Sequence, residues 1–163
     1  MKERKIGILG AGTWGMALAR MLTNSGNDVL VWSAIEQEID NLSATRVHPN
    51  LPGMVIPEAL RFTKSLEEVC SGKDILLFAV PSVFVRSTAA KARPYIRDGQ
   101  VIVDVGLSLG EDGKLHGDVD FQAAEPVVAA ITPVPGGVGA VTSTVLAAHT
   151  VQAALRGQGM EGI

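Results

Sequence analysis

The feature that most constrains the fold of this chain is a glycine-rich turn near its start, Gly10–Gly15, with the pattern Gly-x-Gly-x-x-Gly. The turn directly follows the apolar run Lys5–Leu9, which predicts a buried strand. Apolar side chains then recur at helical spacing from Thr13 to Asn24, and a second apolar run follows at Val29–Trp32. Glycines in this position predict a β-α-β unit with a tight first turn.

Further strands and helices alternate along the rest of the chain. This order predicts the α/β class, a single Rossmann-like doubly wound parallel sheet of about six strands with helices on both faces. We expect residues 1–157 to form this one domain and residues 158–163 to form a frayed tail. The later strands are expected at residues 61–63, 74–80, 101–105 and 130–132, and the later helices at 34–42, 65–71, 82–96, 118–128 and 142–155, with a polar turn or hairpin at 109–115.

Composition agrees with a sheet that is buried on both faces. Of the 163 residues, 47% are hydrophobic but only 4% are aromatic, so the core is built mainly from Val, Ile, Leu and Ala. The net charge of −3 argues against a nucleic-acid partner. No apolar run reaches the roughly 18 residues of a membrane span, and the start of the chain leads straight into a strand, so we expect a cytoplasmic protein.

The residues that commonly bind metals or attack substrates are scattered. His48, His116 and His149 have no metal-ligand spacing, so no metal site is predicted. The single cysteine, Cys70, is interpreted as a half-buried helix residue rather than a nucleophile. Asp104 falls inside an expected strand and is interpreted as a structural carboxylate, so the sequence predicts no catalytic residue.

The glycines of the first turn predict the binding of NAD or NADP. Gly10 permits the tight turn, Gly12 lets a pyrophosphate approach the backbone, and Gly15 lets the helix pack closely on the strand. The free N–H groups and the dipole at the start of the helix would face the phosphates. The alternative is a glycine turn that binds nothing.

Other candidate cofactor-binding residues lie where the parallel strands end. Val80 and Pro81 follow the fourth strand, and Trp14 either stacks on the cofactor or packs against a neighbouring domain. Ser33 stands where an NAD-specific domain carries an acid for the ribose; the nearest acid is Glu36, and no Arg or Lys for a 2′-phosphate is adjacent. The choice between NAD and NADP therefore stays open.

Residues from about 4 to 105 resemble the N-terminal domain of bacterial NAD(P)-dependent glycerol-3-phosphate dehydrogenase. The resemblance implies that Thr13, Trp14 and Ser33 touch the cofactor. That family carries an Ala-Lys-Gly sequence after the fifth strand, but this chain has Gly106-Leu107-Ser108, so the active-site lysine is missing there. The motifs that carry the resemblance are Gly10–Ala19, Val31-Trp32, Asn50–Gly53 and Phe78–Ser82.

Residues from about 101 to 156 resemble a different family, the C-terminal end of methylenetetrahydrofolate dehydrogenase/cyclohydrolase. This resemblance implies that the backbone of Leu107 contacts the nicotinamide end of the cofactor and that the Pro135–Gly139 loop lies beside a folate pocket. The sequence departs from the family at Ala140-Val141, where Pro-Met is usual. The matching motifs are Asp104–Leu107, Glu111–Leu115, Gly117–Phe121 and Ile131–Gly139.

The two resemblances meet near residues 101–108, at a strand that both families possess. We therefore expect an engineered chimera of two Rossmann fragments, with a natural fusion as the alternative. Because both families complete catalysis with a second domain, we expect weak dinucleotide binding without useful turnover. The alternative is an active oxidoreductase on glycerol 3-phosphate or methylenetetrahydrofolate. Apolar surface that such domains would cover predicts a homodimer.

Overall fold

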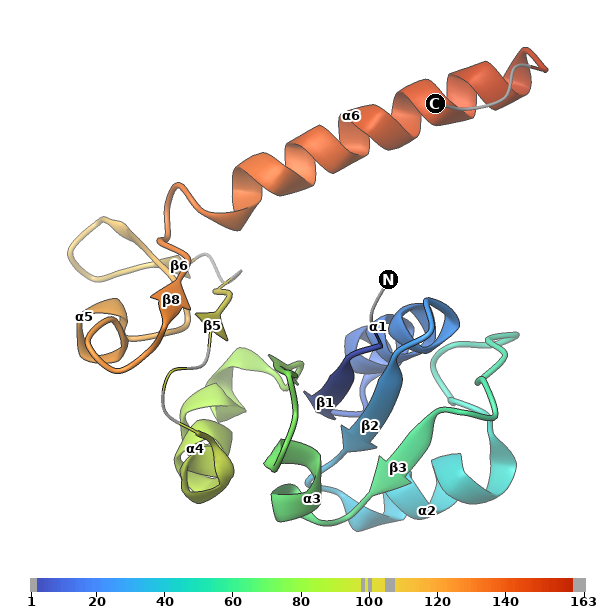
Figure 1. Ribbon diagram of the computed structural model, residues 1–163, viewed down its shortest axis with the longest axis horizontal. Helices are drawn as coiled ribbons and strands as arrows, with labels where there is room; N and C mark the ends of the chain where they lie inside the picture. Colours follow the sequence, from blue (N-terminus) through green and yellow to red (C-terminus); the bar gives the residue numbers. More distant parts are fainter. Residues whose placement is uncertain (1–2, 98, 100, 105–107, 160–163) are drawn as a thin grey trace. The chain divides into compact units, whose positions relative to one another are not determined.

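The computed structural model of the chain describes residues 3–97, 99, 101–104 and 108–159 (Figure 1). These residues divide into two compact units, Met1–Ile96 and Arg97–Ile163. The first unit contains the glycine-rich turn and a four-stranded sheet, and the second contains two small strand pairs and a long helix.

The sheet of the first unit is parallel, and its strands lie in the order β3-β2-β1-β4. The chain moves outward from β1 in one direction to β2 and β3 and then returns to the other side of β1 with β4, which is the doubly wound arrangement. The strands are β1 (Lys5–Leu9), β2 (Asp28–Trp32), β3 (Arg61–Thr63) and β4 (Ile75–Phe78), and the helices are α1 (Thr13–Asn24), α2 (Glu36–Thr45), α3 (Leu66–Cys70), α4 (Ser82–Ala92) and the 3₁₀ helix η1 (Arg93–Tyr95).

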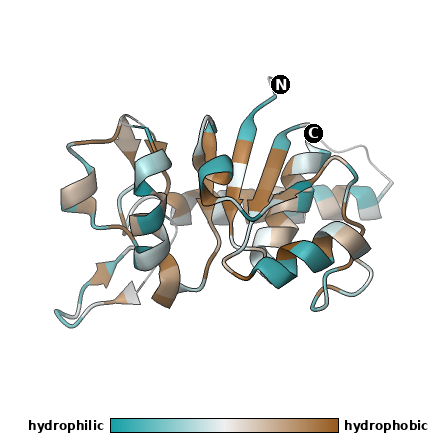
Figure 2. Cartoon of the chain, turned by 90° about the horizontal axis from the view of Figure 1, so that it is seen from below, coloured by the Kyte–Doolittle hydropathy of each residue, from teal (hydrophilic) through white to brown (hydrophobic). Residues whose placement is uncertain are grey.

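Alternating side chains of the strands build an apolar core on each face of this sheet. Hydrophobic residues are concentrated along these strands (Figure 2). On one face, Ile8 and Val31 pack with residues of α1 and α2, which include Met16 and Ile39. On the other face, Leu9, Leu30 and Trp32 pack with Val69 and Cys70 of α3 and with Ala92 of α4. Helices therefore cover both faces of the sheet, as the sequence predicts.

Cys70 lies in the second of these cores. Its exposed fraction is only 1%, and burial raises the pKa of its thiol. A neutral, buried thiol is a poor nucleophile. This agrees with the interpretation of Cys70 as a packed helix residue, although it is more deeply buried than the half-buried position expected.

The α/β class and the parallel sheet are confirmed, but the main sheet has four strands rather than about six. The fifth and sixth expected strands are shorter than expected, β5 (Val101–Ile102) and β8 (Ala130–Ile131), and they pair in parallel with each other in the second unit. The prediction of a single domain over residues 1–157 stays a prediction.

The second unit is organised around Asp104. Its buried carboxylate accepts hydrogen bonds from the backbone N–H groups of Asp118, at 3.2 Å, and Val119, at 3.0 Å. The hydroxyl of Thr132 accepts the N–H of Asp104 at 2.8 Å. Asp104 thus has the structural role expected from the sequence.

The remaining elements of the second unit surround this group. The expected hairpin is confirmed as β6 (Ser108–Leu109) paired antiparallel with β7 (Leu115–His116). Asp120 caps α5 (Phe121–Ala124) by accepting the N–H of Ala123 at 3.1 Å. The last helix, α6 (Val138–Gly157), begins before and ends after the expected range, and none of its described side chains is buried.

A Gly7→Ala substitution tests how closely α3 packs on the sheet. Gly7 faces α3, and an added Cβ would overlap the carbonyl oxygen of Val69 and lie 2.9 Å from the side chain of Leu76. We expect the free energy of unfolding to fall by about 1–3 kcal/mol, the usual cost of overpacking. Urea denaturation measures this change, with Gly12→Ala, which has open space around its Cβ position, as the control. An unchanged midpoint for Gly7→Ala would contradict the packing.

Candidate functional site

Three neighbouring strands bring the candidate site residues to one edge of the sheet. Because β2, β1 and β4 are parallel, their carboxyl ends meet there. The turn Gly10–Gly15 follows β1, Ser33 follows β2, and Val80 and Pro81 follow β4. The structure thus brings together all the predicted cofactor-binding residues except Leu107, which lies outside the described residues.

The first turn is pressed against its neighbours in a way that only glycine permits. Gly10 has a φ of +120°, and a Cβ there would lie 2.5 Å from the carbonyl oxygen of Ala79 and 3.0 Å from the nitrogen of Val80. A Cβ on Gly15 would overlap the carbonyl oxygen of Gly10. The N–H of Gly10 donates to the carbonyl of Trp32 at 2.8 Å, which fixes the turn to the end of β2 as well.

The start of α1 presents unused hydrogen-bond donors. The N–H of Met16 donates to the carbonyl of Gly12 at 2.9 Å, but the N–H groups of Thr13, Trp14 and Gly15 have no acceptor in the part of the chain that the structure describes. No side chain caps the helix, and its first turn contains no acid. Nothing lies within 4 Å of the Cβ position of Gly12. Open space beside free donors at a helix N-terminus suits an anion such as a pyrophosphate.

The side chains around this turn are mostly accessible. Trp14 is 74% exposed, so its indole is available to stack on a bound ring. Thr13 and Pro81 are also exposed, and Val80 is half-buried. These four residues are therefore accessible to a ligand at the turn.

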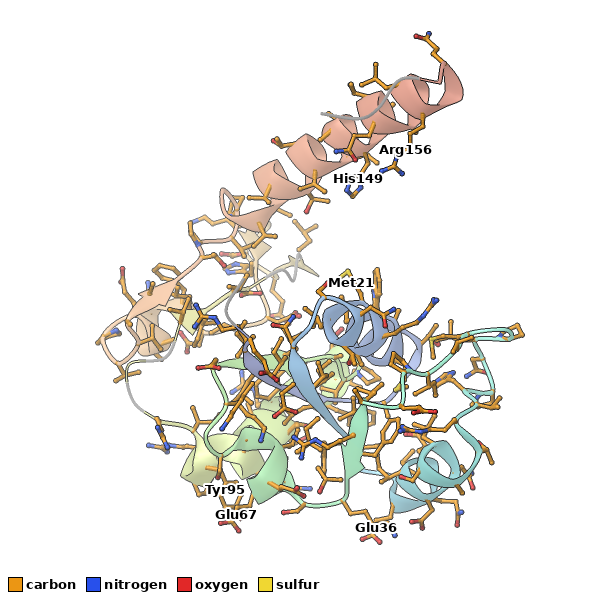
Figure 3. The ribbon with its side chains drawn as sticks, turned by 45° about the vertical axis from the view of Figure 1, so that its right-hand side comes forward. Met21, Glu36, Glu67, Tyr95, His149 and Arg156 are labelled. Carbon is orange, nitrogen blue, oxygen red and sulfur yellow. The ribbon has the colours of Figure 1, made fainter. Side chains whose placement is uncertain are left out.

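Ser33, which the resemblance implies touches the cofactor, is the least accessible of these residues. It is only 6% exposed, and its Oγ donates to Oε2 of Glu38 at 2.6 Å while it accepts the N–H of Ile35 at 3.1 Å. The acid nearest to Ser33 in space is therefore Glu38, not Glu36, the nearest in the sequence. Glu36 projects from the start of α2 (Figure 3) and lies 3.6 Å from the Nζ of Lys64.

His48 ties a long loop to the glycine-rich turn. Its imidazole is 5% exposed, and Nδ1 accepts the N–H of Asn50 at 3.2 Å. Nε2 therefore carries the proton and donates to the carbonyl of Ala11 at 3.1 Å. Sequence reasoning missed this role because it searched the histidines only for metal spacing. Its place directly before the Asn50–Gly53 motif is the signal that could have indicated it.

The residues at this edge of the sheet are poor in groups that transfer protons. Neither Gly10–Gly15 nor Val80-Pro81 contains a titratable side chain. Over the ranges that the structure describes, no group of three or more His, Cys, Asp or Glu side chains could hold a metal ion. Within the same ranges, no helix is both long and apolar enough to cross a membrane.

The doubly wound sheet and the glycine-rich turn at its carboxyl edge define a dinucleotide-binding α/β domain. The family model described as the NAD-dependent glycerol-3-phosphate dehydrogenase N-terminus matches residues 5–116, and the chain belongs to this family. The match extends beyond residue 105, where the resemblance was expected to end.

Two relatives illustrate the similarity to this family. Glycerol-3-phosphate dehydrogenase NAD(P)+ 2 of Lactobacillus delbrueckii subsp. bulgaricus is 57% identical over 135 residues, which cover 73% of this chain and 40% of the relative. The crystal structure of glycerol-3-phosphate dehydrogenase from Coxiella burnetii has a TM-score of 0.58 and 32% identity, and the alignment covers 62% of this chain and 31% of that one.

The chain is also similar to the folate enzymes that the sequence predicts. Bifunctional protein FolD of Lactococcus lactis is 49% identical over 94 residues, which cover 58% of this chain and 31% of the relative. The FolD structure from Campylobacter jejuni has a TM-score of 0.50 and 29% identity over 85% of this chain and 38% of that one. The resemblance to two families is confirmed, and the chain spans at most 40% of the length of these relatives.

Alanine at two glycines separates the binding role of the turn from its packing role. We expect Gly12→Ala to leave the urea midpoint unchanged but to weaken NADH binding at least tenfold, about 1.4 kcal/mol, because the methyl group enters the open space beside the free N–H groups. Gly15→Ala should instead lower stability, because its methyl group overlaps the carbonyl of Gly10. Titration calorimetry and urea denaturation measure the two effects. Undiminished NADH affinity in Gly12→Ala would place the phosphates elsewhere.

Replacement of His48 tests the link between the loop and the turn. His48→Phe fills a similar volume but removes both hydrogen bonds, so the carbonyl of Ala11 and the N–H of Asn50 lose their partner. We expect the free energy of unfolding to fall by about 1–3 kcal/mol and NADH binding to weaken. The control is His149→Phe, because His149 is an exposed residue of α6. Equal unfolding free energies and equal NADH affinities in the two variants would show that the hydrogen bonds of His48 do not stabilise the turn.

Proposed function

We propose that this chain binds NAD or NADP, with the pyrophosphate at the N-terminus of α1. The observation that carries the proposal is the open space at Gly12 beside the N–H groups of Thr13, Trp14 and Gly15. Membership of a family named for NAD dependence supports it. Thr13, Trp14, Ser33, Val80 and Pro81 would complete the site, with Ser33 acting through Glu38 rather than by direct contact.

We further propose that the polypeptide of residues 1–163 binds the cofactor without useful turnover. The turn Gly10–Gly15 and the pair Val80-Pro81 supply no general acid or base. The relatives named for catalysis are more than twice as long as the part that matches this chain. A second candidate function, oxidoreductase activity on glycerol 3-phosphate or methylenetetrahydrofolate, is favoured by the similarity to enzymes of both types.

The similarity to two families leads us to propose that the chain is an engineered chimera of two Rossmann fragments. The matched shares of 73% and 58% together exceed the whole chain, so the two matches overlap. The overlap amounts to at least 31% of the chain, so the region similar to both families is longer than the strand that they share. A continuous reading frame for both segments in a bacterial genome would instead show a natural fusion. Self-association stays a prediction.

One titration tests the binding proposal. Trp14 is exposed beside the turn whereas Trp32 is 8% exposed, so bound NADH should quench the fluorescence of Trp14. We expect saturable quenching in the wild-type chain and its loss in Trp14→Phe, with calorimetry confirming that this variant still binds. Absence of binding by either method at millimolar NADH and NADPH would refute the proposal.

A turnover assay then separates the two candidate functions. The chain is incubated with NAD or NADP and either glycerol 3-phosphate or methylenetetrahydrofolate, and the formation of reduced cofactor is followed by absorbance. We expect none above the rate of a Gly15→Ala control. Clear turnover that depends on the intact turn would establish the oxidoreductase instead.

A further inference from the structure

We propose that Glu38 makes this site select NAD over NADP by placing a carboxylate at the end of β2. This inference rests on the proposed function, because it concerns the same dinucleotide. The sequence left the choice of cofactor open, since the position after β2 is Ser33 and carries no charge. The structure shows a carboxylate bound to that serine.

The carboxylate comes from a helix rather than from the strand. β2 ends at Trp32, and the hydroxyl of Ser33 donates to Oε2 of Glu38 at 2.6 Å. Glu38 stands in the first turn of α2, where the N–H of Glu38 donates to the carbonyl of Ile35 at 3.0 Å. In dinucleotide-binding domains, the acid that recognises the ribose stands at the end of this strand. Here Ser33 holds a carboxylate from α2 beside that position.

Glu38 has capacity left for a ligand. It is half-buried, and its Oε2 accepts the hydroxyl of Ser33; Oε1 accepts no hydrogen bond from any residue that the structure describes. A carboxylate oxygen accepts hydrogen bonds but donates none. It therefore suits a ribose diol, whose hydroxyl groups can donate.

No cation in this part of the fold neutralises Glu38. Among the described residues it takes part in no ion pair, because Lys64 lies 2.7 Å from Asp40 and Arg61 lies 2.6 Å from Asp28. The guanidinium of Arg46 donates to the carbonyls of Leu60 and Glu58, at 2.8 and 2.7 Å. A phosphate monoester carries between one and two negative charges at neutral pH. A 2′-phosphate would therefore meet an uncompensated like charge.

The competing explanation is that Glu38 only stabilises the start of α2. An acid in the first turn of a helix does so through the helix dipole, and its bond to Ser33 would fix the turn between β2 and α2. A purely structural role changes the affinity for NADH and NADPH by the same factor, because the two cofactors differ only at the 2′ position. The ratio of the two dissociation constants therefore separates the explanations.

The experiment measures that ratio by calorimetry in the complete chain and in two matched variants. We expect the wild-type chain to bind NADH more tightly than NADPH, and Glu38→Gln to shift the ratio toward NADPH by at least tenfold. The control, Glu36→Gln, makes the same change of charge in the same helical turn but at a side chain that projects away and lies near Lys64 (Figure 3). It should leave the ratio within about twofold of the wild type.

A third variant tests the hydrogen bond from Ser33 to Glu38. Ser33→Ala keeps the charge of Glu38 but removes the hydroxyl that holds it, so the ratio should shift in the same direction by a smaller factor. An unchanged ratio in Glu38→Gln, or an equal loss of both affinities, would overturn the inference while leaving the proposed function intact. Failure of the wild-type chain to bind either cofactor would instead refute the proposed function.

Discussion

The close approach of backbone to backbone at the first turn is the constraint on which the described site depends. Gly10 lies against Ala79 and Val80, and Gly15 lies against Gly10, at distances that leave no room for a Cβ. This contact places the start of α1 between the ends of β1 and β4, where the order of the sheet reverses. The free N–H groups of Thr13, Trp14 and Gly15 lie at the carboxyl edge of the sheet as a result. The residues that carry the family resemblance at Gly10–Gly15 are therefore the same residues that form this close contact.

Much of the first unit could be predicted from the sequence because its signals are local. The helix Thr13–Asn24 and the strand Lys5–Leu9 have the expected bounds, since apolar periodicity and glycine punctuation act within a few residues. Ser65 caps α3 by accepting the N–H of Glu68 at 3.2 Å, and a serine three residues before a glutamate is a local signal for such a cap. The number of strands in the sheet was less predictable. Apolar runs identify strands, but which strand pairs with which depends on contacts distant in the sequence.

The contrast between local signals and contacts distant in the sequence also explains which parts of the site could be predicted. The glycine turn and the ends of β1 and β2 follow from spacing, and the sequence identified them, whereas β4 ends two residues earlier than expected. His48 and Glu38 act through hydrogen bonds that form only after the chain has folded, to Ala11 and to Ser33. Their chemistry was visible in the sequence, but their targets were not. Neither the burial of His48 nor the hydrogen bond of Glu38 could be predicted before the fold was known, because residue type alone does not determine a partner.

The bond from His48 to Ala11 joins residues 37 positions apart in the sequence. Its consequence is thermodynamic. Opening the loop that contains His48 would break its hydrogen bond to the carbonyl of Ala11. The loop and the turn therefore share part of their local unfolding free energy. A ligand held by the turn would then also protect the loop from amide hydrogen exchange, because His48 links the two segments. Hydrogen exchange in the loop thereby becomes a reporter of occupancy at the turn.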